Sequence, residues 1–553
     1  MDNMKTIKDI LELYDEISEI EELDEWHVFF NLRGCRFILI MPDHQEKWSR
    51  PFICVHNNDS LNLPHVMLHS FNDKSLPNGE YRYVCLAEQE SVVYSLLSFE
   101  EKILDAVDRL IEISDFKGIE IERELQKEFK YYWNDACENK KESYDVYIAH
   151  SEKCLLLDVY YGKKKRLVEK DITLNDLNDK AEGKRIWEQH YEYKAVYIPI
   201  TDSRGIIPPH KGYKWSTRDI RNIVYGIQIN HISDETFAFL NDIEHTTQNV
   251  LLVFGIVINQ TEQVFSARVY FKNTVKKPLF EKLCNDIKKI EPILSSRKDY
   301  RYLNQQIGND KTNCSKKIAL IGAGSLGSYV AQELVKNGIL NLRIYDDDIL
   351  EEANIMRWAY SGFGIGNKKS PTLALALNWT HPEINVEWID HDFTEREITD
   401  VVNTFDMIIF TIGNSDSQLR FNSALKNSDC KIPVIYAWLE AGGEFSHVLF
   451  VDYQNAGCYE CLYTDENGDA VNNRATKSLY ISENTIQNGC GGTRVAYGTL
   501  PLLRTTAVVL DVMKQYWDGK LNHSKLIDID SRQIAESDIS FPIARCGCCG
   551  NKE

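Results

Sequence analysis

The sequence lacks several features that would place it outside the ordinary globular proteins. None of its apolar runs approaches the roughly 18–20 residues that a membrane-spanning helix needs. The start, MDNMKTIKDILELYDEI, is acidic and amphipathic, so it does not resemble a secretory signal. No internal repeat, low-complexity tract or obvious flexible linker interrupts the chain. We therefore expect ordered domains and a cytoplasmic location.

Positive charge is also scarce in this chain. Its 63 Lys and Arg residues against 83 Asp and Glu give a formal net charge of −20. Because contacts with phosphates need clustered Lys and Arg, this balance argues against general binding to nucleic acid or to an anionic membrane. We interpret the local basic run from Lys163 to Arg166 as a solvated loop rather than a nucleic-acid patch.

The 14 cysteines occur without a secretory signal. This combination argues against a disulfide framework and for reduced thiols, metal ligands or catalysis. The length of 553 residues suits about two to four domains. We predict three: residues 1–120, residues 121–305 and residues 306–553.

The expected elements give each region a fold class, and the chain as a whole is predicted to be α/β. Region 1–120 shows a helix, alternating strands, a loop containing Cys85 and a further helix from Ser98 to Ser114, which predicts an α+β domain. Region 121–305 mixes strands with short helices, and residues 277–290 are expected to close it as a helix. Region 306–553 alternates strand and helix, as a doubly wound, Rossmann-like α/β domain does.

A glycine-rich loop in the third region indicates a nucleotide site. Gly322, Gly324 and Gly327 follow an apolar strand-like run, Lys317 to Ile321, and begin a helix. Backbone N–H groups at such a helix start can bind phosphates. About twenty residues further on, Asp346 ends a second apolar strand, where a carboxylate can accept hydrogen bonds from ribose hydroxyls. An NAD enzyme would show the same features.

Three further polar residues distinguish ATP from NAD. Asn354, Arg357 and Lys369 place an amide, a guanidinium and an ammonium group shortly after Asp346. A hydride-transfer enzyme does not need that cluster, whereas an enzyme that neutralises an ATP triphosphate does.

Asp416 is a candidate magnesium ligand. It follows the strand predicted over 406–410, next to the expected nucleotide crevice, where a carboxylate can hold Mg²⁺ against phosphate oxygens. The alternative is an aspartate that only favours a helix N-terminus through the helix dipole.

Two pairs of cysteines have the spacing of a zinc site. Cys458 and Cys461 form one CxxC pair, and Cys546 and Cys549 form the other. Four thiolates at this spacing make a tetrahedral structural Zn²⁺ site. Cys548 lies inside the second pair, so the ligand there could shift by one residue. The alternative is a set of ordinary thiols.

Cys490 has a different setting. It lies between glycines shortly before a long apolar helix expected from Tyr497 to Tyr516. A thiol ahead of a helix N-terminus can have a lowered pKa and attack an acyl-adenylate. The alternative is a spare buried cysteine.

Together these residues resemble the ThiF/MoeB/ubiquitin-activating superfamily, in order and spacing as well as in type. The resemblance implies a ThiF-type adenylation domain that uses ATP and Mg²⁺ to adenylate the C-terminal glycine of a ubiquitin-like protein. Asp346 would then bind the ribose, and Arg357 and Lys369 the phosphates. Asp416 would bind Mg²⁺, and Cys490 would form a thioester. The family architecture also implies a homodimer.

One position departs from the family pattern. Arg301-Tyr-Leu-Asn304-Gln-Gln-Ile is similar to the family's Arg-Tyr-x-Arg-Gln-Ile, whose second arginine reaches ATP across a dimer. Asn304 occupies that position here, so either Arg301 replaces this contact or the contact is absent.

The amino-terminal region resembles a ubiquitin-conjugating domain. Its order of helix, strands, Pro64-His65-Val66 and Val84-Cys85-Leu86 is similar to that family's, whose cysteine accepts an acyl group and delivers it to an amine. By this resemblance Cys85 is catalytic, with His65 orienting the loop or stabilising an oxyanion. Cys85 as a core cysteine, His65 as a structural histidine and His69 in its place remain alternatives.

A conjugating domain followed by an activating domain resembles the fused ligase-like proteins of CBASS anti-phage operons. This likeness implies that the C-terminus of a cGAS-like nucleotidyltransferase is activated and conjugated to an amine on a protein or small molecule. Residues 121–305 would be a linker domain that holds this partner.

Three rival readings remain open. A sulfur-carrier adenylyltransferase would use Cys490 in sulfur transfer and residues 1–120 for docking. A non-catalytic scaffold would keep the folds without forming a thioester. An NAD-dependent oxidoreductase is disfavoured by Arg357, Lys369 and Asp416.

Overall fold

The computed structural model describes most of the chain. The described residues are 6–41, 51–56, 64, 66–70, 81–86, 97–161, 165–175, 188–189, 195–200, 202–210, 213–225, 234–258, 260–309, 311–360, 364–478, 485–487, 493–495, 497–530, 534–537, 542–547 and 549–550. They form two compact units: one extends to Lys170 and resumes from 188 to Arg297, and the other contains 171–175 and the residues from Lys298 onward. Within this part of the chain no helix combines the length and apolar character that crossing a membrane requires.

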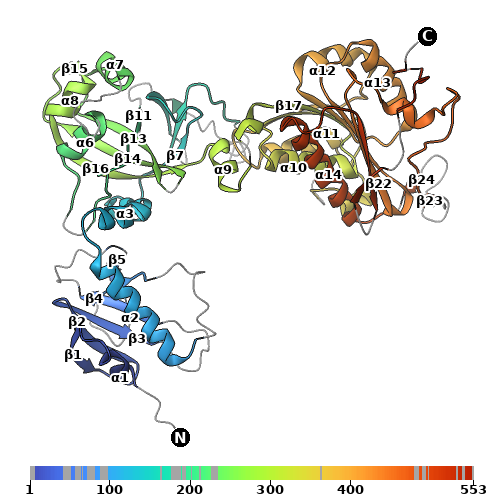
Figure 1. The fold of residues 1–553 in the computed structure, drawn as a ribbon. Helices are drawn as coiled ribbons and strands as arrows, with labels where there is room; N and C mark the ends of the chain where they lie inside the picture. Colours follow the sequence, from blue (N-terminus) through green and yellow to red (C-terminus); the bar gives the residue numbers. More distant parts are fainter. Residues whose placement is uncertain are drawn as a thin grey trace, which may run out of the picture. The chain divides into compact units, whose positions relative to one another are not determined.

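The first unit begins with an antiparallel sheet covered by a long helix (Figure 1). The sheet has the order β1-β2-β3-β4-β6-β5. Its strands are β1 (Ile17–Glu22), β2 (His27–Leu32), β3 (Cys35–Ile40), β4 (Phe52–His56), β5 (Val66–Ser70) and β6 (Tyr81–Val84), preceded by the short helix α1 (Ile7–Leu11). Helix α2 (Phe99–Asp115) starts at a capping box of Ser98 and Glu101. Its residues Ile103, Val107 and Leu110 are buried in one core with Phe30 and Phe37. This sheet positions Cys85 directly after β6.

The rest of the first unit is built around a closed barrel. Its strands are β7 (Ser143–Tyr147), β8 (Leu155–Tyr161), β9 (Lys165–Glu169), β11 (Ala195–Ile200), β13 (Asn249–Ile258), β14 (Thr261–Phe271) and β16 (Ile287–Arg297). The hydrogen-bonded order β8-β11-β13-β14-β16-β7-β9 returns to β8, because β8 pairs with both β11 and β9. The strands therefore form a ring without an open edge, which removes the unpaired backbone groups of edge strands.

Helices and short strands complete this barrel domain. They are α3 (Ile119–Lys127), α4 (Phe129–Ala136), α6 (Thr217–Tyr225), α7 (Asp234–Asp242), α8 (Leu279–Asn285), β10 (Glu188–Gln189), β12 (Glu244–His245) and β15 (Lys277–Pro278). A cluster of large aromatic rings holds the helices to the strands: Trp133 of α4 lies 4.5 Å from Phe265 of β14 and 4.8 Å from Trp215, between ring centroids. The domain is α+β, as the sequence indicates.

Two local predictions in this domain are wrong. The helix expected over 277–290 covers only Leu279–Asn285, and the chain then enters β16, which pairs with β14 and β7. Burial between two strands outweighs the local helix preference of residues 287–290. The basic run is not a solvated loop in its described part: Lys165 and Arg166 begin β9, and only 6% of Arg166 is exposed.

The second unit is a doubly wound α/β domain, which confirms the predicted fold class. Its sheet order is β19-β18-β17-β20-β21-β22-β25-β26, parallel from β19 to β21 and antiparallel beyond. The strands are β17 (Lys317–Ile321), β18 (Asn341–Tyr345), β19 (Asn385–Ile389), β20 (Met407–Phe410), β21 (Val434–Leu439), β22 (Phe445–Val451), β25 (Lys525–Asp530) and β26 (Ile534–Glu536).

Helices cover both faces of this sheet (Figure 1). Helices α10 (Ser325–Lys336), α11 (Lys369–Asn378) and α14 (Thr499–Trp517) share one core with the sheet, and α12 (Ile398–Thr404) and α13 (Ser415–Asn427) share the other. Helix α9 (Tyr300–Gln306) and the 3-10 turns η2 (Lys311–Ser315), η3 (Glu352–Arg357), η4 (Glu395–Glu397), η5 (Ala441–Gly443) and η6 (Tyr459–Tyr463) complete the unit. Since β17 lies between β18 and β20, the strand order reverses at its carboxyl end, where such folds bind their ligands.

Candidate functional site

A cavity of about 340 Å³ opens at this reversal point of the second unit. Its wall includes the last residues of β17 and β18, Ile321 and Tyr345, and Thr411, which follows β20. Gly322, Gly324, Asp346 and Lys369, all predicted from the sequence, line it as well. The fold thus brings together residues from separate strand ends in one crevice.

The glycine loop is shaped by two close approaches of the backbone. Gly322 has φ +105°, a conformation that side chains disfavour, and a Cβ there would lie 2.9 Å from Oγ1 of Thr411. A Cβ on Gly327 would lie 2.0 Å from the carbonyl oxygen of Gly322. Gly327 therefore packs the start of α10 against the loop. Gly324 has open space around its Cα, and α10 begins immediately after it. The N-terminus of α10 is consequently directed toward the loop.

Asp346 links the glycine loop to the end of β18 by a hydrogen bond. Its Oδ2 accepts a hydrogen bond from the backbone N–H of Ala323 at 2.6 Å, and its Oδ1 accepts one from the N–H of Asp348 at 3.0 Å. Burial raises the pKa of Asp346, and the nearby charge of Lys369 opposes this rise. A carboxylate in this position can accept hydrogen bonds from a ribose while it holds the phosphate loop.

Lys369 is buried, with 8% of the residue exposed. Its Nζ lies 2.7 Å from Oδ2 of Asp348, and its backbone N–H donates to the carbonyl of Asp348 at 2.8 Å. Burial, followed by the charge of Asp347, raises the pKa of Asp392. Four aspartates (346, 347, 348 and 392) line the cavity, and Lys369 and Arg420 are the two cationic residues that line it with them. With all of these ionised, a triphosphate would meet an excess of negative charge, so its binding there requires a cation.

Gly327, which packs α10 against the loop, and three predicted polar residues lie outside the cavity lining. Oδ1 of Asn354 accepts from the N–H of Glu351 at 3.0 Å in η3. The guanidinium carbon of Arg357 lies 5.3 Å from the centre of the Tyr497 ring. The side chain of Asp416, in the first turn of α13, is 88% exposed, with an oxygen 3.6 Å from Nε of Arg420. Their assigned roles stay predictions.

The cavity also contains residues that the sequence argument did not assign. Asn414, Ser417 and Arg420 line it from the start of α13, and Asp348 and Asp392 line it from the loops after β18 and β19. The run Asp346-Asp347-Asp348 was a usable signal, because three carboxylates follow one buried strand. Arg420 gave a weaker signal, one helical turn after Asp416.

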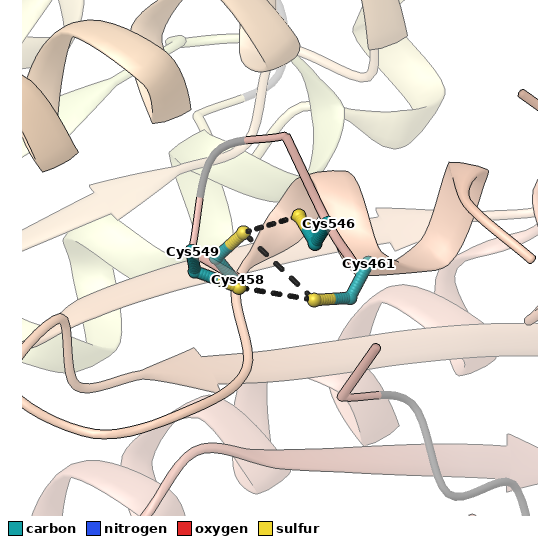
Figure 2. Close-up of side chains that lie close together, drawn as sticks. All are labelled: Cys458, Cys461, Cys546 and Cys549. Carbon is teal, nitrogen blue, oxygen red and sulfur yellow. Dashed lines mark hydrogen bonds between the residues drawn. The ribbon is translucent and has the colours of Figure 1, made fainter. Parts of the chain in front are cut away.

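The four predicted cysteine ligands lie together in a second place of this unit (Figure 2). Sγ of Cys458 lies 4.0 Å from that of Cys461 and 3.7 Å from that of Cys546, and Sγ of Cys461 lies 3.2 Å from that of Cys549. All four sulfurs lie within 4.8 Å of one another, and the four cysteines are free thiols rather than disulfides. Cys548, the alternative ligand, lies outside the described residues.

These sulfurs fit a tetrahedral ion. Four ligands about 2.3 Å from Zn²⁺ form a tetrahedron with edges of about 3.8 Å, close to the distances observed here. Hydrogen bonds with the other thiols, first with that of Cys458, lower the pKa of Cys546. The cluster joins η6 to the end of the chain, 88 residues away. Its donor set could therefore hold a structural metal ion that ties these segments together.

Cys490 itself lies outside the described residues. The strands β23 (Thr485–Gln487) and β24 (Thr493–Val495) on either side of it pair as an antiparallel hairpin, with Gln487 opposite Thr493. Tyr497, two residues before the start of α14, carries the ring beside Arg357.

A buried ionic cluster fixes the chain shortly before this hairpin. The ring of His447 is fully buried, with Nε2 2.6 Å from Glu440 and Nδ1 2.9 Å from Asp528. Glu440 also accepts hydrogen bonds from the backbone N–H groups of Lys477 and Ser478 at 2.8 and 2.7 Å. Burial opposes the charge on His447, but its bonds to Asp528 and Glu440 raise its pKa overall. Glu440 and His447 lie far from Asp528 in the sequence and the three form no motif, so this cluster could not be recognised from the sequence.

Cys85 lies directly after β6 in the first unit and is half-buried. Nη1 of Arg109, on α2, is 3.5 Å from the carbonyl of the next residue, Leu86. His65 lies outside the described residues; its neighbour Val66 pairs with Val84, the residue before Cys85.

Asn304 is bonded within its own chain. Only 3% of it is exposed; its Nδ2 donates to the carbonyl of Tyr300 at 3.0 Å, and its Oδ1 accepts from Asn309 at 2.8 Å. The side chain that occupies the family's arginine position is thus part of the local packing of α9.

The fold and the cavity together define a nucleotide-binding domain of the doubly wound α/β class. The particular family follows from the sequence, because residues 304–546 match the model of the ThiF family. The part of the chain that was predicted to be a ThiF-type domain is thus the part that matches this family.

Several known proteins are similar to this part of the chain. The ATP-dependent ubiquitin transferase-like protein Cap2 of Escherichia coli (strain TW11681) is 28% identical over 191 residues, which cover 33% of this chain and 31% of Cap2. Ubiquitin-like modifier-activating enzyme 5 of Drosophila ananassae is 27% identical, over 28% of this chain and 42% of the enzyme. The crystal structure of E. coli MccB with ATP is 20% identical with a TM-score of 0.34, covering 45% of this chain and 72% of MccB. The matches thus span about a quarter to under a half of these curated relatives' lengths.

Proposed function

We propose that this chain is an enzyme that adenylates the C-terminus of a protein with ATP and then conjugates that C-terminus to an amine. The observation that supports this most strongly is the cavity at the end of β17, where an open glycine loop, Asp346 and Lys369 meet inside a ThiF domain. The names of the relatives, ubiquitin transferase-like and modifier-activating, agree with this type of reaction.

The first step would occur at this cavity. The N–H groups of the glycine loop and the start of α10 bind phosphate oxygens, and Asp346 binds the ribose. A carboxylate oxygen of the partner's C-terminus attacks the α-phosphorus, giving an acyl-adenylate and releasing pyrophosphate. Lys369 neutralises charge that develops on the leaving phosphates once it exchanges Asp348 for them. Mg²⁺ would supply the remaining positive charge, and Asp416 and the aspartates of the cavity are its candidate ligands.

Two cysteines would then pass the acyl group on. The thiolate of Cys490 attacks the acyl carbon, so a thioester forms and AMP leaves. The thiolate of Cys85 attacks this thioester, and Cys490 regains its thiolate. An amine finally attacks the second thioester, which forms an amide, releases a proton and frees Cys85. His65 would orient the loop or stabilise the oxyanion in the last step.

The substrate we propose is the C-terminus of a cGAS-like nucleotidyltransferase, in anti-phage defence. The likeness to Cap2 and the predicted order of a conjugating domain, a linker domain and an activating domain support this choice. The chain's net charge of −20 means that such a partner must be recruited by specific docking. We further propose a cytoplasmic homodimer and a structural Zn²⁺ at the four cysteines.

Pyrophosphate exchange tests the adenylation step. The chain should exchange labelled pyrophosphate into ATP when a cGAS-like nucleotidyltransferase that it activates is present, and not when that protein lacks its last residues. Lys369→Gln should lower the exchange rate about 100-fold or more, since one charged group at developing charge contributes on that order. Lys336→Gln, on the exposed side of α10, is the matched control and should leave the rate unchanged.

The rival functions predict different outcomes. A sulfur-carrier adenylyltransferase would show exchange, and Cys85→Ala would leave product formation intact. A scaffold would show no exchange, and both cysteines could be replaced without effect. An NAD-dependent oxidoreductase would bind NAD in place of ATP.

A further inference from the structure

A second cavity lies at one mouth of the barrel in the first unit, the domain with strands β7 to β16 in Figure 1. Its volume is about 480 Å³. It is lined by the end of β8 at Tyr161 and by the starts of β7, β11 and β13 at Tyr144, Ala195 and Asn249. Barrel mouths are places where proteins bind small ligands, and a volume of this size suits one.

A compact ionic network supports one wall of this cavity. The carboxylate of Glu142 lies 3.0 Å from Nζ of Lys165 and 2.7 Å from Nη2 of Arg268, and it accepts a hydrogen bond from the hydroxyl of Tyr144 at 3.0 Å. Nζ of Lys165 also lies 5.3 Å from the centre of the Tyr144 ring and 5.8 Å from that of Tyr161. Two cations thus share one carboxylate, which leaves a net positive charge beside the cavity.

Arg268 brings this charge to the cavity lining. Nη2 of Arg268 donates hydrogen bonds to the carboxylate of Glu142 and, at 3.3 Å, to the hydroxyl of Tyr144. Its Nε is buried and has no hydrogen-bond partner among the described residues. A guanidinium has five N–H donors, so this side chain retains donors for a further acceptor. The side chain of Arg268 is 24% exposed, so its guanidinium remains accessible from the cavity although its Nε is buried.

The other walls are apolar or neutral. Leu156, Val159, Val196 and Leu251 provide aliphatic surface, while Thr246, Thr247 and Asn249 provide hydroxyl and amide groups. His245 is hydrogen-bonded to Thr247 at 2.9 Å, and burial, followed by the charge of Lys282, lowers its pKa, so it is neutral at pH 7. Glu244 is ion-paired with Lys276. Arg268 is therefore the only cation among the residues that line this cavity.

We infer that the barrel mouth binds an organic carboxylate, with the carboxylate on the guanidinium of Arg268 and an apolar group against the aliphatic wall. Arg268, Lys165 and Glu142 together carry a net charge of about +1, which matches a monoanion. The fork of N–H donors on the guanidinium matches the geometry of a carboxylate. A phosphate dianion would require more positive charge than this mouth offers. The carboxylate can be the C-terminal end of a peptide or a free small acid. The site lies in the other unit from the ATP cavity, so this inference does not depend on the adenylation proposal.

Binding to the full chain tests this directly, by calorimetry and ligand-detected NMR without ATP. The probes are N-acetyl-Phe-Gly with a free carboxylate, the same peptide as its carboxamide, 3-phenylpropionate, and inorganic phosphate. We expect the carboxylate probes to bind at least about tenfold more tightly than the carboxamide, as a charge-assisted hydrogen bond implies. Tighter binding of the dipeptide indicates a peptide end, and tighter binding of 3-phenylpropionate indicates a small acid.

Variants with opposite expected effects separate recognition from misfolding. Arg268→Gln should weaken carboxylate binding about tenfold or more, whereas Glu142→Gln, which removes the competing carboxylate, should strengthen it. Thr246→Trp places a large ring on an exposed lining residue and should abolish binding, while Thr261→Trp, at the far end of β14, should not. The inference is overturned if no probe binds, if the carboxamide binds as well as the carboxylate, if phosphate binds most tightly, or if Arg268→Gln has no effect.

Discussion

Oδ2 of Asp346 accepts a hydrogen bond from the backbone N–H of Ala323 at 2.6 Å, which joins the end of β18 to the glycine loop after β17. The proposed ribose carboxylate therefore also shapes the proposed phosphate site. Replacing Asp346 should affect both ends of a bound nucleotide.

We predict that Asp346→Asn weakens ATP binding about tenfold or more, because a hydrogen bond to a charged group contributes about 1.5–3 kcal/mol. Burial raises the pKa of Asp346, so this carboxylate is protonated at a higher pH than an ordinary aspartate. As the pH is lowered, the affinity of the natural chain for ATP should therefore fall at a correspondingly higher pH. Calorimetric titration with ATP measures both effects. Asp511→Asn, on the exposed side of α14, is the control. Equal affinity in the Asp346 variant would remove this residue from the nucleotide site.

For the cysteine cluster, we predict about one zinc ion per chain, held by Cys458, Cys461, Cys546 and Cys549. Cys458→Ser should lose the metal and lower the melting temperature, because three thiolates do not close the tetrahedron. Cys430→Ser, at a buried thiol outside the cluster, should retain the metal. Elemental analysis of the purified chains and thermal unfolding with and without a chelator measure these effects. Absence of metal from the natural chain even after refolding with zinc would refute the site.

His447 should make the stability of the second unit depend on pH. Its bonds raise its pKa above the ordinary 6.5, so its contribution is complete below pH 6.5 and is lost as the pH rises through the raised value. Although burial opposes ionisation, the bonds of Glu440, first to His447, lower its pKa from 4.5 to about 2. The contribution of Glu440 is complete above pH 4.5 and is lost as the pH falls toward 2. The cluster should thus stabilise most between about pH 4.5 and 6.5.

His447→Gln tests this cluster. It should lower the free energy of unfolding by about 3–5 kcal/mol in that pH window, as breaking a buried ion pair does, and by less at alkaline pH. His523→Gln, at an exposed histidine, should show no such dependence. Chemical unfolding at several pH values measures the difference. A loss that is constant across pH would mean that the cluster acts through packing alone.

The sequence predicts the second unit well because its signals are local. Strand, glycine loop and helix follow one another between Lys317 and Lys336, and CxxC spacing needs no knowledge of the fold to indicate a metal cluster. The ionic cluster of His447 could not be predicted, because Glu440, His447 and Asp528 meet only through the pairing of β22 with its neighbours. Closure of the barrel also depends on distant pairings, and the strand β16 follows helix-like local sequence.

The second cavity illustrates the same limit. Glu142, Lys165 and Arg268 are far apart in the sequence, and the basic run that contains Lys165 gave no indication of its partners. Only the pairing of β14 with β16, of β16 with β7 and of β7 with β9 brings these charges together.

The proposed relay is tested most directly by trapping its thioesters. The chain is incubated with ATP and a cGAS-like nucleotidyltransferase, and thiol-sensitive adducts are located by non-reducing gels and mass spectrometry. We predict that the natural chain forms adducts, that Cys85→Ala accumulates the adduct on Cys490 without amide product, and that Cys490→Ala forms neither. Cys54→Ala, at a buried cysteine of β4, should behave as the natural chain does. An adduct that persists in Cys490→Ala, or the absence of any thiol-sensitive adduct, would contradict the relay.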